Sequence, residues 1–165
     1  MKEERLQGKS VETILIAVDY DPSAQKVAET GYHLAQAMNA RVVILHAITD
    51  TIGYYSRGYS SIMGFTGYAN NDLWNLGSME DLTAASREYL DKIRIHLGDP
   101  AIETVIETGD PSDAILKVAD RSNADIIVMG SHSRRGLEKI LMGSVAGQVL
   151  HRTVVPVFII PVRKV

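Results

Sequence analysis

The sequence has no cysteine among its 165 residues. Disulfide bridges and thiolate metal sites are therefore excluded, and secretion into an oxidising compartment is not favoured. The sequence also lacks an apolar run long enough to cross a bilayer. The charged segment Met1–Glu12 has no apolar core of the kind that signal peptides carry. We therefore expect a cytoplasmic protein with no membrane partner.

An excess of charge of either sign is also missing. The chain has 17 Lys and Arg against 20 Asp and Glu, for a net charge of -3. A general nucleic-acid binder normally presents a basic surface, so we expect no nucleic-acid partner. The apolar fraction of 45% and the charged fraction of 22% are ordinary for a globular protein. The length suits one domain with its own core.

Short apolar runs alternate with segments of helical periodicity along most of the chain. Such runs are typical of strands that are buried on both faces of a parallel sheet. The pattern predicts strands at 13–18, 41–47, 102–108, 125–129 and 154–160, with helices at about 23–39, 79–97, from 111, and at 144–151. Alternation of this kind predicts an α/β fold with right-handed crossovers. We find no internal repeat and no second domain, so we expect a flexible segment 1–11 and one domain over 12–165.

Helix starts are marked by residues that commonly cap helices. Asp21 or Ser23 is placed to cap the first helix, and Asp110 directly precedes Pro111 at the start of a later one.

The stretch 51–78 breaks the alternation of strands and helices, because it is rich in tyrosine and glycine, contains the single Trp74 and has no regular period. We expect a long loop there, and a lid, an oligomer contact and disorder all remain open.

Two segments stand at strand ends, where ligands bind in open parallel sheets. Asp19 follows the first strand and Gly130 ends the fourth, so both face one crevice if these strands are neighbours. The glycine-punctuated, basic segment from Gly130 leads to Gly143, where a helix begins. Glycine backbone and a helix N-terminus both offer N–H groups to an anion.

These features describe an anion cradle to which Arg134 and Arg135 would add positive charge, and Ser144 could either cap the helix or donate to a phosphate oxygen. The segment matches neither the phosphate-binding loop GxxxxGK[ST] nor the dinucleotide motif GxGxxG. The alternative interpretation is that the glycines only form turns and Ser144 only caps a helix.

The order of residues around this segment resembles the universal stress protein family, whose nucleotide motif is G-x2-G-x9-G-[ST]. Here Met129-Gly130 opens the motif, Ser133 stands in place of its second glycine, and Gly143-Ser144-Val145 closes it at the same spacing. Arg135 also replaces a usual Thr or Ser. Further resemblance lies in 14–19, 109–111, 124–128 and 156–160. Together these segments extend over nearly the whole chain except 51–78.

The resemblance implies a five-stranded parallel sheet of order 3-2-1-4-5 with helices on both faces, as in the adenine nucleotide α-hydrolase-like fold. It also implies binding of ATP, ADP or AMP, with Mg2+ held through the phosphates, and a homodimer formed through the strand Val157–Ile160. The nucleotide-binding residues that it implies are Ala17, Val18, Asp19, Ala47, Met129, Gly130, Ser133, Arg134, Gly143, Ser144 and Val145.

The resemblance suggests a stress-response sensor or regulator without fast catalysis. No nucleophile with a nearby base is apparent, so any ATPase or autophosphorylation activity should be slow. A nucleotide-independent adaptor that uses 51–78, and a hydrolase or transferase of a related fold, remain as alternatives. We interpret His132 as structural and His46 as a half-buried packing residue, and we place His33, His96 and His151 on the surface.

Overall fold

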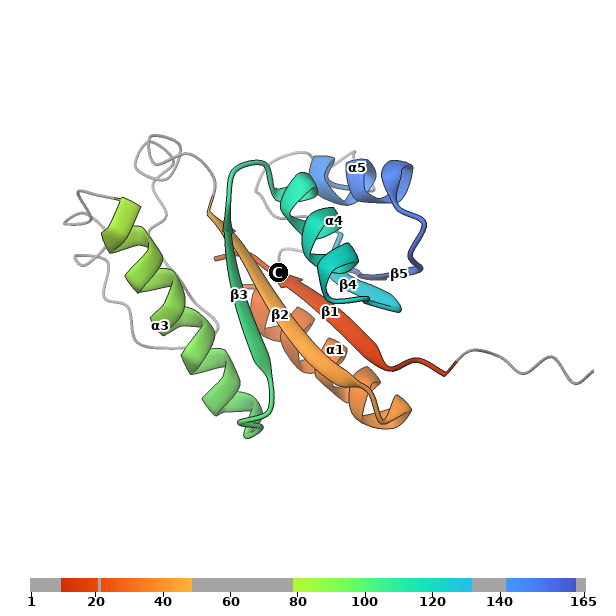
Figure 1. The fold of residues 1–165 in the computed structure, drawn as a ribbon, viewed down its shortest axis with the longest axis horizontal. Coiled ribbons are helices and arrows are strands. Elements are labelled where there is room, and N and C mark those ends of the chain that lie inside the picture. The colour runs from red at the N-terminus through yellow and green to blue at the C-terminus, as the bar shows by residue number, and fades with distance from the viewer. Residues whose placement is uncertain (1–9, 21, 49–78, 132–141, 163–165) are drawn as a thin grey trace, which may run out of the picture.

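The computed structural model describes residues 10–20, 22–48, 79–131 and 142–162. Strands and helices alternate along them (Figure 1). The elements are β1 (Thr13–Val18), α1 (Ala24–Met38), β2 (Arg41–Ile48), α3 (Met79–Leu97), β3 (Glu103–Thr108), α4 (Pro111–Arg121), β4 (Ile126–Gly130), α5 (Ser144–Arg152) and β5 (Val157–Ile160).

All five strands form one parallel sheet in the order β3-β2-β1-β4-β5, which confirms the expected topology. The central strand β1 pairs with β2 on one side and with β4 on the other, so that Ile16 lies opposite Ile44 and Val128. β3 lies at one edge of the sheet, as its alternating sequence predicts.

The helices cover both faces of the sheet (Figure 1). α1 and α3 pack on one face, where the core includes Ile14 and Ile16, and α4 and α5 pack on the other, where it includes Leu15. Successive residues of a strand point to opposite faces, and all three of these side chains are fully buried. β1 therefore reads as a continuous apolar run because it needs apolar side chains on both sides.

Four strands differ from their predicted ranges. β2 ends at Ile48 and β3 begins at Glu103, each one residue from the predicted boundary. Asp125 precedes β4, and its carboxylate instead accepts hydrogen bonds from the backbone N–H groups of Glu12 and Thr13, at 2.9 and 3.1 Å. β5 begins at Val157 rather than Val154. The Thr153 hydroxyl accepts from the N–H of Val155 at 2.9 Å, so this N–H does not pair with the neighbouring strand β4.

The structure confirms one of the predicted helix caps. Asp110 caps α4 by accepting from the N–H of Asp113, with Pro111 as the first helical residue. Ser23 precedes α1, but its side chain makes no capping bond. Ser144 was a possible cap for α5, but it is the first helical residue, and Gly143 takes the cap position. Asp21 lies outside the described residues.

Candidate functional site

The position at which the sequence predicts a crevice lies where the strand order reverses. The chain runs from β1 outward to β2 and β3, and then returns to the other side of β1 with β4 and β5. Because β1 and β4 are paired in parallel, their carboxyl ends lie at the same edge of the sheet. Asp19 and Gly130 therefore stand at the ends of neighbouring strands, which is the condition for both residues to face one crevice.

Burial divides the predicted site residues into two sets. Val18 and Met129 are buried, in the cores on opposite faces of the sheet, so only their main chains are placed to meet a ligand. The other predicted residues that the structure describes are at least partly exposed, namely Ala17, Asp19, Ala47, Gly130, Gly143, Ser144 and Val145.

Ser131 holds the start of α5 close to the end of β4. Its carbonyl accepts from the N–H of Gly143 at 2.6 Å, and its own N–H donates to the carbonyl of Ile160 at 2.9 Å. Its hydroxyl accepts from the N–H of Val162 at 3.1 Å. Sequence reasoning assigned no role to Ser131. The signal was a small polar residue directly after a buried strand, where a side chain can bond the neighbouring backbone.

The first turn of α5 offers N–H groups at this edge. Its first intrahelical bond runs from the N–H of Gly147 to the carbonyl of Gly143, at 2.9 Å. Helix geometry leaves the earlier N–H groups without intrahelical acceptors and gives this end a partial positive charge. The arrangement suits an anion.

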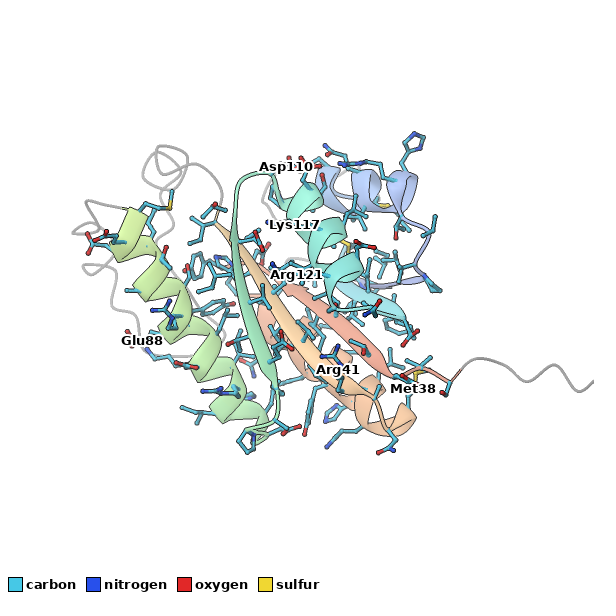
Figure 2. All side chains as sticks on the ribbon, viewed as in Figure 1. Met38, Arg41, Glu88, Asp110, Lys117 and Arg121 are labelled. Carbon is cyan, nitrogen blue, oxygen red and sulfur yellow. The ribbon has the colours of Figure 1, made fainter. Side chains whose placement is uncertain are left out.

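Polar side chains hold α5 against α4. Ser112 is 1% exposed, and its hydroxyl lies 2.8 Å from the amide oxygen of Gln148. Arg152 donates to the carboxylate of Asp113 at 2.6 Å. The Ser112 hydroxyl also donates to Asp110, and this bond is the largest cause that lowers the pKa of the Asp110 carboxyl. Figure 2 shows Asp110 at the end of α4 that adjoins α5.

His46 is fully buried, which corrects the half-buried position expected for it. Only 1% of its surface is exposed, and its Nδ1 lies 3.0 Å from the carbonyl oxygen of Val18. Burial lowers the pKa of the imidazole to about 4, against a smaller opposing effect of the bond to Val18. A neutral ring that bonds a carbonyl through Nδ1 must carry its proton there. The three helical histidines, His33, His96 and His151, are exposed as predicted.

The remaining site predictions fall outside the described residues. They comprise Ser133, Arg134, Arg135, His132 and the aromatic stretch 51–78. Their roles stay predictions. Within the described ranges, no three His, Asp or Glu side chains gather to hold a metal ion, and no helix is long and apolar enough to cross a membrane.

The fold defines an α/β domain of the doubly wound class, with the start of α5 beside the end of β4 at its switch point. The profile of the universal stress protein family matches residues 10–161. The chain belongs to this family.

Curated relatives match most of the chain. Universal stress protein MJ0577 of Methanocaldococcus jannaschii is 26% identical over 155 residues, which cover 89% of this chain and 93% of that protein. Universal stress protein A of Escherichia coli K12 is 26% identical over 151 residues, covering 91% and 94%.

Solved structures show the same fold at lower identity. Universal stress protein UspA from Lactobacillus plantarum matches with a TM-score of 0.70 and 20% identity, covering 93% of this chain and 99% of that one. A universal stress protein in complex with cAMP matches with a TM-score of 0.61 and 23% identity, covering 92% and 98%.

The buried, neutral state of His46 has a measurable consequence. Its folded pKa of about 4 lies below the ordinary value of 6.5, so the unfolded state binds more protons between these values. The contribution of His46 to stability is thus complete above about pH 6.5 and is lost as the pH falls towards 4. In NMR spectra of the imidazole, we expect His46 to keep its neutral Nδ1–H signature from pH 8 to pH 5.

The imidazole signal that disappears from the spectrum of the His46→Asn variant is assigned to His46. A His46 signal that titrates near pH 6.5 would show that the ring is accessible to water and would contradict the buried geometry.

Proposed function

We propose that this stress protein binds ATP or a related adenine nucleotide at the carboxyl ends of β1 and β4. It acts in the cytoplasm as a homodimeric sensor or regulator, and each protomer has one domain over 12–165. The observation that carries the proposal is the position of Asp19 and of the Gly143–Ser144 helix start at adjacent strand ends. The relative that was solved with cAMP supports an adenine nucleotide as the ligand class.

Each part of the nucleotide has a residue of suitable chemistry. The carboxylate of Asp19 would accept hydrogen bonds from ribose hydroxyls. Ala17 and Ala47 are small, partly exposed residues near the ends of β1 and β2, where they would leave room for a base. The first N–H groups of α5 and the Ser144 hydroxyl would bind phosphate oxygens.

Magnesium would come to this site with the nucleotide. The described residues provide no cluster of carboxylates or imidazoles for a metal, so Mg2+ would be held by phosphate oxygens. The buried imidazole of His46 bonds the Val18 carbonyl through Nδ1 and is therefore not available as a general base. We expect turnover to be slow and binding to be the function.

A bulky residue at Gly143 should remove nucleotide binding and spare the fold. The backbone of Gly143 has φ -68° and ψ 161°, an extended conformation that any residue adopts. A Leu side chain there would occupy the space in front of the first N–H groups of α5. In calorimetric titrations with Mg-ATP, after bound nucleotide has been stripped, we expect micromolar binding by the natural protein and at least about a hundredfold loss in Gly143→Leu.

The matched control is Gly147→Leu, one turn further along α5, where an added Cβ meets no atom within 4 Å. Its affinity should equal that of the natural protein. Equal affinity in Gly143→Leu would reject the phosphate-binding role of the helix start. If the natural protein failed to bind at millimolar Mg-ATP, the adaptor alternative would replace the nucleotide proposal.

The homodimer is proposed through β5, which lies at an edge of the sheet. An edge strand presents main-chain groups that another strand can pair with. Apolar side chains around it face solvent, since Phe158 is 44% exposed, Leu150 40% and Val154 99%. A second copy of this strand would pair with the outer edge of β5 and cover these side chains at the same time.

A charge on β5 should therefore separate the protomers. We expect the natural protein to sediment as a dimer at micromolar concentration, and Phe158→Asp to sediment as a monomer, because a carboxylate cannot be buried there without a partner. Ile95→Asp is the matched control, since Ile95 is an apolar residue on α3 that is 76% exposed. A natural protein that remains monomeric, or a Phe158→Asp variant that remains dimeric, would contradict the β5 interface.

A further inference from the structure

Four buried polar or aromatic residues surround the main chain that leads into the candidate site. Tyr20, His46, Ser86 and Tyr89 are between 1% and 5% exposed, and they come from the segment after β1, from β2 and from α3. The Tyr20 ring lies 4.2 Å from the His46 ring and 4.7 Å from the Tyr89 ring, measured between centroids. We call these four residues the strand-end cluster.

Side chains of the strand-end cluster make hydrogen bonds at three successive residues, Val18, Asp19 and the cluster member Tyr20. The carbonyl oxygen of Val18 lies 3.0 Å from His46 Nδ1, and the carbonyl oxygen of Asp19 accepts from the Tyr89 hydroxyl at 2.6 Å. The hydroxyl of Tyr20 and that of Ser86 lie 2.7 Å apart. The main chain on both sides of the Asp19 side chain is thus tied to β2 and to α3.

Packing alone does not require polar side chains at these positions. Aliphatic side chains would fill the same layer between the sheet and α3 without polar groups that require partners. A carbonyl beyond the end of a strand, however, needs a donor when it is buried. The two side-chain donors satisfy the carbonyls of Val18 and Asp19, and they fix the path of the main chain where it leaves the sheet. Asp19 itself remains partly exposed.

Resting on the proposed function, we infer that Tyr89 is a positioning residue that holds the Asp19 carboxylate where a nucleoside ribose binds. Its ring is supported by His46 and by Tyr20, whose hydroxyl bonds Ser86. The residue does not touch the ligand in this account. Its effect reaches the ribose through one hydrogen bond to the Asp19 carbonyl. Helix α3, which contributes no residue to the predicted nucleotide site, thereby becomes part of the support of that site.

The test separates positioning from general destabilisation by the choice of ligand. Tyr89→Phe removes one hydroxyl and keeps the ring that packs on Tyr20. We expect its affinity for Mg-ATP to fall roughly fivefold to tenfold, the effect of one buried hydrogen bond. Affinity for Mg-2′,3′-dideoxy-ATP, which lacks the ribose hydroxyls, should stay unchanged. In an Asp19→Ala background, the Tyr89→Phe change should have no further effect on Mg-ATP.

Tyr32→Phe is the matched control. Tyr32 on α1 packs on the same core layer as Tyr89 and donates to the Asp99 carboxylate at 3.1 Å. This bond lies away from the carboxyl ends of the strands, so Tyr32→Phe also loses one hydroxyl and one hydrogen bond, but not at the proposed site. It should bind both nucleotides as the natural protein does. If Tyr89→Phe does not fold, Ser86→Ala, which removes the hydroxyl beside Tyr20, is assessed by the same two affinities.

Equal losses for both nucleotides, or no loss for either, would overturn the positioning role. Failure of the natural protein to bind Mg-ATP would instead reject the proposed function on which the inference rests. The two failures are thus distinguished by the natural protein alone.

Discussion

Burial of β1 on both faces is the constraint on which the rest of the structure depends. Ile14, Leu15 and Ile16 are fully buried, and their side chains alternate between the layer under α1 and α3 and the layer under α4 and α5. A strand buried in this way must have neighbours on both edges and helices on both faces. The first polar residue that can follow it, Asp19, is thereby carried to the edge of the sheet where the strand order reverses.

The same edge combines two kinds of support. Hydrogen bonds of Ser131 to Gly143, Ile160 and Val162 hold the start of α5 close to the ends of β4 and β5. On the other face, His46 and Tyr89 bond the carbonyls of Val18 and of Asp19 itself. Polar groups are buried here because main chain that has left the ladder still needs partners. The ordinary requirement to satisfy these groups thus fixes the path of the main chain at the proposed site.

Much of this arrangement could be predicted from the sequence, since apolar runs and caps are local signals. The ranges of β1 and α3 and the Asp110 cap were correct, and so was the sheet order, which came from the family resemblance. The start of β5 was wrong because the bond from Val155 to the Thr153 hydroxyl is not encoded in hydrophobicity. The full burial of His46 was missed because it depends on Tyr20 and Tyr89, which approach from distant parts of the chain. The partners of Ser131 depend in the same way on β5 and α5.

The central claim is that an adenine nucleotide binds at the carboxyl edge between β1 and β4. Mapping of amide chemical shifts in 15N-labelled protein during titration with Mg-ATP tests it most directly. The account predicts saturable changes concentrated at Asp19, Ser131 and Ser144, with none at Gly98 and Asn123, which follow α3 and α4 at the opposite edge of the sheet. Changes confined to that opposite edge, or none at millimolar Mg-ATP, would contradict the claim.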